Sequence, residues 1–252
     1  MEPLGFTTAK LSWSLLMSSL RRVQSTEARV PAVDLNLEAG PCVVLSCIAV
    51  EAFVNEISSL SHSFLFDRER DTRTGRPIPG VADDVLQKVS DIRVDRRGSF
   101  YVRYRDLLRA IGIDKPAFLA DLSTLGKVRD SLVHFRDCDV PIIDDEDGVI
   151  RHGQKLPPTV AALQSKKYET MGVLAPGAGT AWTLRLATDA MAAWSLDLAF
   201  DAAMYLLDHL PPGEYRDFIW KAYAHRDKSF PVVFARGKSD LATWWSTTRG
   251  QS

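Results

Sequence analysis

The segment from Gly40 to about Leu60 constrains the fold more than any other part of the chain. Its apolar residues leave no polar face: Val43, Val44, Leu45, Ile48, Val50, Phe53, Val54 and Ile57. Pro41 stands where the first turn of a helix needs no N–H donor. A helix that is apolar nearly all round has to be covered by protein on every side. The segment therefore predicts a buried helix at the centre of a helical assembly.

Apolar residues at helical spacing recur along the rest of the chain. They predict helices over about 8–23, 81–89, 118–136, 180–210 and 214–225. Strand-like alternation is limited to a possible short stretch at Pro231–Phe234. We therefore expect an all-α fold, an up-and-down bundle of four to five long helices with loop insertions and a small C-terminal extension.

The charged and Gly/Pro-rich segments predict where the bundle is interrupted. The sequence SFLFDRERDTRTGRPIPG indicates an exposed loop over residues 63–80. An acidic segment with Pro141 indicates a second loop over 137–158. On this basis residues 1–212 form the bundle, and residues 213–252 form a helical extension followed by a polar tail.

The net charge of -1 and the pI near 6.5 exclude a global basic field that would attract nucleic acid. One local patch interleaves basic and aromatic residues between Arg93 and Arg105. Such a pattern is typical of surfaces that contact single-stranded RNA. An equally good interpretation is a solvated helix face with two tyrosines packed inward. The candidate RNA contacts are Arg96, Arg97, Arg103 and Arg105.

The cysteines and the apolar runs give expectations about compartment and cofactors. Cys42, Cys47 and Cys138 have no metal-ligand spacing, and their odd number argues against a disulfide framework. We therefore expect a reducing, cytoplasmic setting. The run Pro41–Val50 is too short to span a bilayer before Glu51 interrupts it, and no signal peptide is predicted, so no membrane partner is expected.

Most sequence signatures of catalysis are missing. Gly177–Thr180 lacks the lysine and the preceding strand of a P-loop, and HExxH and Gly-x-Ser-x-Gly motifs do not occur. The histidines and cysteines are scattered, which argues against a zinc site. The sequence therefore predicts neither a metal nor another cofactor.

The stretch KVRDSLVHFRD contains the pair that is most suggestive of chemistry, Arg129 and His134. About one arginine followed by a histidine at a spacing of five to seven residues is expected by chance in a chain of this composition, so the spacing alone carries little weight. Asp130 lies one helical turn before His134 and shares its face. A carboxylate there would orient the imidazole and raise its pKa.

The buried helix carries a second polar feature, Glu51 and Asn55, one turn apart on one face. A buried carboxylate without a partner is costly. We therefore predict that Glu51, Asn55 and Arg129 form one cluster, with His134 at its edge. The competing interpretation is a buried salt bridge that only fixes the register of two helices.

Several motifs, taken in order, resemble the HEPN superfamily of helical-bundle proteins. They are AVEAFVNEI from Ala49 to Ile57, then LQKVSDI, YRDLLRAIG and LSTLGKVRDSLVHF, with a tryptophan-bearing helix from Ala181 onward. The resemblance covers roughly residues 11–210. It adds an expected fold, a helical bundle, that agrees with the periodicity.

The resemblance implies a metal-independent endoribonuclease that acts on RNA in toxin–antitoxin, abortive-infection or other defence systems. It implies His134 as general acid/base, Arg129 as the group that stabilises phosphate charge, and Asp130 in the polar position beside it. Glu51, with Asn55, would hold Arg129 in place. Where relatives have asparagine, Asp130 adds negative charge near the incoming phosphate.

The resemblance also implies a homodimer in which two Arg–His motifs face a shared cleft, with an antitoxin protein as a possible further partner. Two alternatives remain open. The chain could be a catalytically inactive HEPN-like module for dimerisation or interaction, or it could be an RNA-binding regulator. Salt-dependent binding without cleavage would indicate the regulator.

Overall fold

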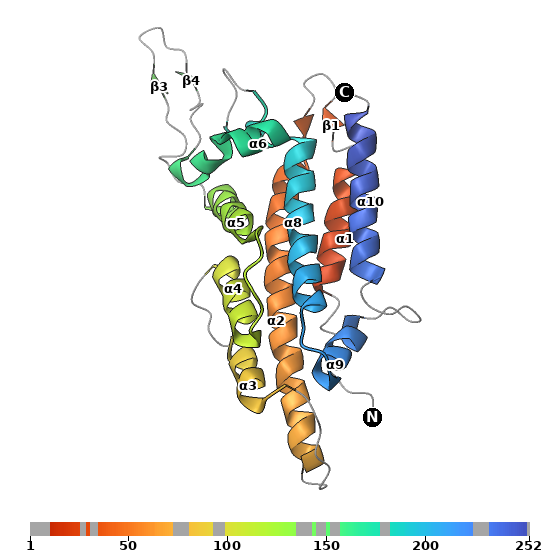
Figure 1. The fold of residues 1–252 in the computed structure, drawn as a ribbon. Helices are drawn as coiled ribbons and strands as arrows, with labels where there is room; N and C mark the ends of the chain where they lie inside the picture. Colours follow the sequence, from red (N-terminus) through yellow and green to blue (C-terminus); the bar gives the residue numbers. More distant parts are fainter. Residues whose placement is uncertain are drawn as a thin grey trace. The chain divides into compact units, whose positions relative to one another are not determined.

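The computed structural model describes residues 11–25, 29–30, 35–72, 81–92, 99–134, 143–144, 150–151, 157–176, 182–223 and 232–250. These residues are almost entirely helical, so the prediction of an all-α fold is confirmed (Figure 1). The strands are two antiparallel pairs of two-residue segments. β1 (Arg29–Val30) pairs with β2 (Leu35–Asn36), and β3 (Ile143–Asp144) pairs with β4 (Ile150–Arg151).

The chain divides into two compact units. The first comprises residues 1–15, 48–119 and 199–239, and the second comprises residues 16–47, 120–198 and 240–252. Each unit is therefore assembled from segments that lie far apart in the sequence. Four described helices contribute several residues to each unit: α1 (Leu11–Val23), α2 (Ala39–Thr72), α8 (Asp189–Asp208) and α10 (Val232–Arg249).

In the first unit, the C-terminal part of α2 is flanked by other helices on two sides (Figure 1). α3 (Asp83–Asp91) and α4 (Phe100–Ile111) lie on one side, and α9 (Glu214–Tyr223) lies on the other. Hydrogen bonds tie α4 to α8 and α9 to α2. Tyr104 Oη donates to the carbonyl of Ala202 in α8 at 2.8 Å, and the hydroxyls of Ser61 and Tyr215 lie 2.7 Å apart.

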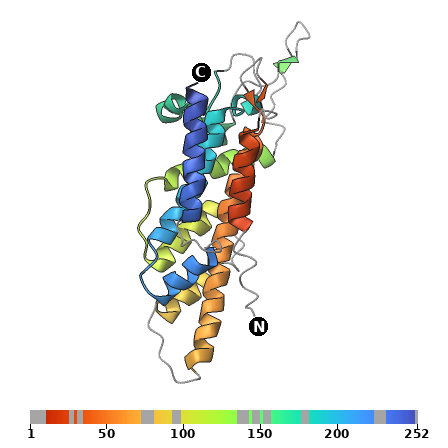
Figure 2. The ribbon, with the colours of Figure 1, turned by 90° about the vertical axis from the view of Figure 1, so that its right-hand side faces the viewer.

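Aromatic rings join α1, α2, α9 and α10 inside the first unit. Phe234, which is fully buried, packs its ring against Trp13 with the centroids 5.3 Å apart, and it also contacts Phe53 and Tyr223. In Figures 1 and 2 this first part of α10 lies beside α1. Aromatic contacts of this kind bury large apolar areas. They explain why α10 belongs to the fold.

In the second unit, α1, α2 and α8 meet around a buried thiol. Cys42 Sγ lies 3.1 Å from the hydroxyl of Ser19 and 3.5 Å from that of Ser195. Small side chains at such a crossing let helix backbones approach closely. The other helices of this unit are α5 (Leu119–Val133), the 3-10 helix η6 (Pro158–Gln164), α6 (Lys166–Met171) and α7 (Trp182–Arg185).

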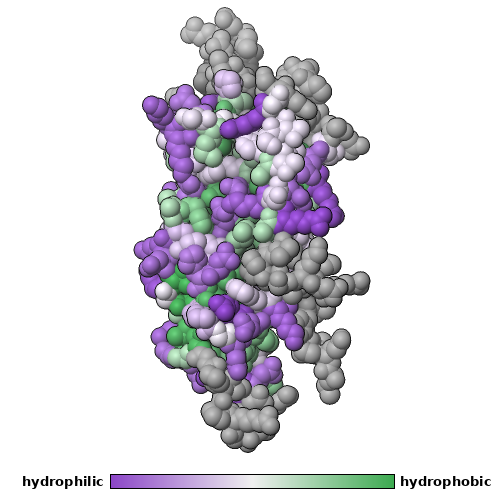
Figure 3. All heavy atoms as spheres, turned by 45° about the vertical axis from the view of Figure 1, so that its right-hand side comes forward, coloured by the Kyte–Doolittle hydropathy of each residue, from purple (hydrophilic) through white to green (hydrophobic). Residues whose placement is uncertain are grey.

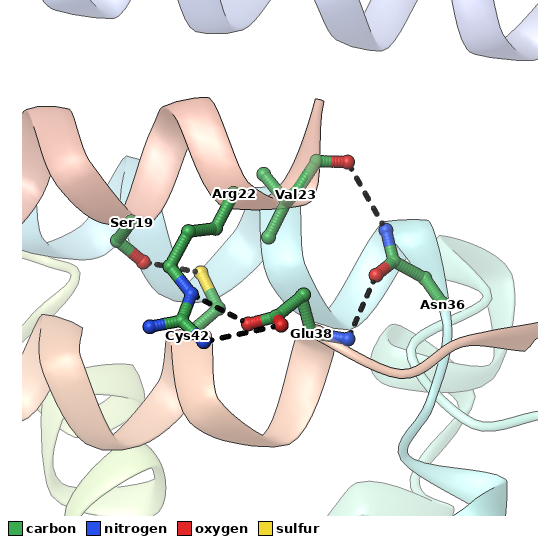
Figure 4. Close-up of polar contacts among 6 residues, drawn as sticks. All are labelled: Ser19, Arg22, Val23, Asn36, Glu38 and Cys42. Carbon is green, nitrogen blue, oxygen red and sulfur yellow. Dashed lines mark hydrogen bonds and ion pairs between the residues drawn. The ribbon is translucent and has the colours of Figure 1, made fainter. Parts of the chain in front are cut away.

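Asn36, only 1% exposed, connects the ends of three helices in the second unit. Its amide donates to the carbonyl of Val23 at the end of α1 and to Asp189 Oδ1 at the start of α8, at 3.3 and 2.6 Å. Its carbonyl oxygen accepts the N–H of Glu38 at 3.0 Å. Glu38 in turn pairs with Arg22 of α1 (Figure 4). One buried amide thus satisfies backbone groups that helix ends leave without partners.

The structure corrects three predicted boundaries. The loop predicted over 63–80 is wrong for its first half, because α2 continues to Thr72, and residues 73–80 lie outside the described part. The single helix predicted over 180–210 is two helices, because Thr188 Oγ1 accepts the N–H of Met191 at 2.9 Å and starts α8 anew. The predicted tail contains α10, so neither a tail nor a strand at Pro231–Phe234 is correct.

The surface of the described residues is mixed in character. Figure 3 shows hydrophilic and hydrophobic side chains interspersed on one face. Two helical stretches are long and apolar enough to cross a membrane, Ala39–Glu69 and Asp189–Asp208, but 67% and 72% of their most apolar windows are buried inside the protein. Core helices of soluble proteins pass the same test, so this finding is weak evidence for a membrane span.

Candidate functional site

The Arg–His pair lies at the C-terminal end of α5 in the second unit. Arg129 and Asp130 are in the helix, and His134 follows its last residue, Val133. The N–H of His134 still donates to the carbonyl of Asp130 at 2.8 Å, so the helical turn continues to the histidine. This local geometry keeps Asp130 and His134 on one face, as the spacing predicted.

Asp130 pairs with its neighbour rather than with the histidine. Arg129 Nη1 lies 2.8 Å from Asp130 Oδ1, and the side chains are 29% and 54% exposed. His134 is exposed, and its imidazole has no hydrogen-bond partner among the described residues. The expected bond from Asp130 to the imidazole is therefore not formed within this part of the chain. The imidazole of His134 is thus exposed, whereas the guanidinium of Arg129 is half-buried and paired with Asp130.

The structure gives Glu51 and Asn55 an arginine that the sequence analysis did not choose. Arg103 of α4 donates from Nη1 to Glu51 Oε1 at 3.1 Å and from Nη2 to Asn55 Oδ1. Arg129 and His134 belong to the second unit, so their place relative to this first-unit cluster stays a prediction. Glu51 does have a cationic partner, which is Arg103, but the prediction that its carboxylate is buried is wrong, because the side chain is 41% exposed.

The predicted RNA contacts need a partial correction. Arg103 is only 9% exposed and its guanidinium is engaged by α2, so it is not a free phosphate ligand. Arg105 is half-buried and donates to Asp106 at 3.0 Å, and this pairing lowers the charge that it offers to RNA. Arg96 and Arg97 lie outside the described residues. The basic patch is therefore weaker than its sequence indicates.

The sequence does contain a signal for the role of Arg103. In α4 the buried residues recur at helical spacing, and Arg103 lies within this stripe beside Tyr104: Phe100, Arg103, Tyr104, Leu107, Leu108 and Ile111. An arginine on the buried stripe of an amphipathic helix requires an acceptor on a neighbouring helix. Because basic and aromatic residues alternate around it, Arg103 was instead assigned to the RNA-contacting patch.

Sequence reasoning missed a second buried carboxylate, Glu56 of α2, which is 5% exposed. Its Oε1 accepts the N–H of Ser12 at 3.0 Å, and its Oε2 accepts the hydroxyls of Ser12 at 2.7 Å and Tyr223 at 2.8 Å. Glu56 thus joins α1, α2 and α9 in the first unit. Burial raises the pKa of the Glu56 carboxyl above its ordinary value, and the hydrogen bonds from Ser12 and Tyr223 oppose this effect in part.

The helix that carries Arg129 is also tied to α6. Asp121 of α5 accepts a hydrogen bond from Tyr168 Oη at 2.8 Å and pairs with Lys167 Nζ at 2.5 Å. Burial, helped by Asp121, raises the pKa of Tyr168 to about 12, so the phenol stays protonated and donates. These contacts fix the start of α5, thirteen residues before His134.

Within the described ranges, no three histidine, cysteine, aspartate or glutamate side chains gather as a metal site would require. Comparisons with known proteins give no further guidance, because no family model, curated protein or solved structure matches the chain. The assignment of function therefore rests on the chemistry of the residues.

Proposed function

We propose that the chain is a metal-independent endoribonuclease of HEPN type, with Arg129 and His134 as its reacting pair. The observation that carries the proposal is the end of α5, where an exposed histidine follows a half-buried arginine by five residues and the helical hydrogen bonding continues to that histidine. The motif order noted in the sequence supports it. With the nuclease we also propose a cytoplasmic homodimer that acts on RNA in a toxin–antitoxin or other defence role.

The proposed chemistry needs only proton transfer and charge stabilisation, because RNA supplies its own nucleophile. The imidazole of His134 accepts the proton of a 2′-hydroxyl as the hydroxyl oxygen attacks the adjacent phosphorus. The bond from phosphorus to the 5′ oxygen breaks, and that oxygen takes up a proton from the imidazolium. The products carry a 2′,3′-cyclic phosphate and a 5′-hydroxyl. The guanidinium of Arg129 binds two non-bridging oxygens of the phosphate.

Asp130 opposes binding of the phosphate to Arg129, because its carboxylate already pairs with the guanidinium at 2.8 Å. A phosphate has to displace this carboxylate from the guanidinium or share the guanidinium with it. Asp130→Asn keeps the shape of the side chain and removes the charge. We expect this variant to bind RNA more tightly than the unmodified chain.

The test is cleavage of total cellular RNA by the purified chain in EDTA, with the product ends mapped. We expect cutting that leaves cyclic phosphate ends and is lost in His134→Ala and in Arg129→Ala. His209→Ala and Arg109→Ala serve as matched controls, because both side chains are exposed and lie in the first unit. Cleavage that persists in His134→Ala, or that requires added metal, would contradict the proposal.

One observation favours a second function, a binding module without catalysis. Glu51 and Asn55, which the HEPN resemblance assigns to Arg129, hold Arg103 in this chain. A site arginine without that support is less well positioned. Absence of cleavage by the unmodified chain, with the two alanine variants differing only in stability, would select the binding module.

A further inference from the structure

The first unit contains an open groove of about 300 Å³ that the proposed nuclease site does not use. It runs along α2, with the start of α1 as its second wall. The residues that line it are Leu11, Ile48, Glu51, Ala52, Asn55, Glu56 and Ser59. From Ile48 to Ser59 the helix rises by about 16 Å, at about 1.5 Å per residue.

One edge of the groove is apolar and exposed. Leu11 is 57% exposed and Ile48 is 36% exposed, and Ala52 lies one turn beyond Ile48. A leucine and an isoleucine exposed to this extent beside a concave surface are typical of sites that take an apolar side chain. This edge therefore favours an aliphatic group in the occupant.

The other edge offers polar atoms at one-turn intervals. Glu51 Oε1 accepts from Arg103, whereas Glu51 Oε2 has no partner among the described residues, and the side chain is 41% exposed. Asn55 uses only its carbonyl oxygen for Arg103, so its amide N–H groups have no acceptor in this part of the chain. A free carboxylate oxygen and a free amide donor fit an ammonium group and a backbone carbonyl of the occupant.

The charge of the groove lining favours an occupant that carries a positive charge. Among the described residues, both charged groups in its lining, Glu51 and Glu56, are acidic, and no lysine or arginine of this part of the chain lines it. Arg103 offsets one carboxylate from behind, where its guanidinium is buried against α2. An approaching phosphate would meet these carboxylates without a facing cation, so RNA does not fit here, whereas a cationic side chain does.

We propose that this groove binds an extended segment of a partner protein, about five residues long, in which a lysine or arginine is followed by a branched aliphatic residue. At about 3.3 Å per residue such a segment matches the length of the groove. The cationic group pairs with Glu51 Oε2, and the aliphatic side chain packs on Leu11, Ile48 and Ala52. The exposed walls suit a crossing chain better than an enclosed small molecule. This inference is independent of the proposed nuclease activity.

The test uses the intact chain labelled at isoleucine methyl groups, with the Ile48 methyl as the NMR reporter. The probe is an acetylated and amidated peptide of sequence Gly-Lys-Leu-Gly-Lys-Leu-Gly, compared with the same peptide in which glutamate replaces lysine. We expect a saturable shift with the lysine peptide only. Glu51→Gln should weaken its binding about tenfold, because the amide keeps the bond to Arg103 but removes the charge. Asp67→Asn, an exposed acid on α2 outside the groove, should leave the binding unchanged.

Three results would overturn the proposal. Equal binding of the two peptides, or undiminished binding by Glu51→Gln, would show that charge does not determine recognition. The absence of any saturable shift would show that the groove does not bind such a segment. A shift of the Ile48 methyl on dilution without peptide would instead assign the groove to a second copy of the chain. Contacts from that methyl to residues 1–10 in the peptide-free chain would assign it to the chain's own N-terminal segment.

Discussion

At the scale of single residues, the first unit depends on polar groups that are buried and paired. Arg103 joins α4 to α2 through Glu51 and Asn55, and Glu56 joins α2 to α1 and α9. A buried ion pair costs desolvation energy, and removal of one partner leaves the other without compensation. These residues therefore determine which helix faces meet more than they add net stability.

Replacing Arg103 by methionine should lower the free energy of unfolding by about 2 kcal/mol, less than for a fully buried pair because Glu51 is partly exposed. The variant leaves Glu51 Oε1 and Asn55 Oδ1 without their donor. Urea unfolding followed by circular dichroism measures the change. The matched control is Arg109→Met on the exposed face of the same helix, which should change the free energy little. A loss of equal size in the control would show that the buried pair is not the cause.

The Glu56 carboxyl should make the stability depend on pH in a direction opposite to that of most acids. Its folded-state pKa is raised above the ordinary value of 4.5, so the stability that it contributes is present below pH 4.5 and is lost as the pH rises through the folded pKa. The unfolding free energy of the unmodified chain minus that of Glu56→Gln should therefore increase as the pH falls from about 7 toward 4.5. A difference that stays constant over this range, in parallel urea titrations, would refute the shift.

The sequence predicted the need of Glu51 for a cation but not the cation. A carboxylate within a largely apolar helix is a local feature that the sequence reveals, although the structure leaves this one partly exposed. Which arginine meets it depends on how helices far apart in the sequence pack. The polar spacing around Arg129 and the buried stripe around Arg103 gave competing signals, and only the packing of α4 on α2 decides between them.

At the scale of helices, the periodic apolar residues correctly predicted the position of most helices. Charged and polar composition led to wrong predictions of a loop at the end of α2 and a tail in place of α10. The end of α2 was predicted as a loop because Asp67–Thr72 is charged, yet arginine and glutamate are good helix formers and extend an established helix. α10 was predicted as a tail although it buries Phe234 and Leu241. Its contacts come from Trp13 and other distant residues, which the local pattern does not reveal.

Gly237 of α10 lies against the ring of Phe200 in α8, and Gly237→Ala should destabilise the chain. A Cβ there would lie 2.7 Å from the ring of Phe200, which is fully buried and has little room to move. We expect a loss of about 1 kcal/mol, because overpacking outweighs the gain in helix propensity. Thermal and urea unfolding measure it.

Gly40→Ala is the matched control for this prediction, because a Cβ at Gly40, also helical, meets nothing within 4 Å. The control should be neutral or slightly stabilising. If Gly237→Ala proved as stable as the control, the close approach of α10 to α8 would be disproved.

At the scale of the whole molecule, charge limits how the chain can interact with RNA. Its net charge is -1, and three of its described basic side chains that were candidates for RNA contact, Arg103, Arg105 and Arg129, each have an acidic partner. These three side chains are therefore less available to neutralise phosphates. Recognition of RNA, if the nuclease proposal holds, has to rely on a small contact area around the reacting pair.

The affinity for single-stranded RNA should accordingly depend only weakly on salt. Each phosphate contact contributes about −0.7 to the slope of log Kobs against log salt concentration, so two or three contacts predict a slope of about −1.4 to −2.1. Fluorescence anisotropy with His134→Ala, which is expected not to cleave, gives the slope directly. A slope near −5 would mean that a large basic surface takes part.

The burial of Cys42 and Cys47, at 1% and 2% exposure, has a practical consequence. Burial also raises the pKa of the Cys42 thiol, so the reactive thiolate is scarce in the folded chain. A thiol-specific reagent can then reach these sulfurs only during moments when the second unit opens. In the Cys138→Ser variant, the rate of thiol labelling would report how often the second unit opens under native conditions. It would give the local stability of the second unit without any denaturant.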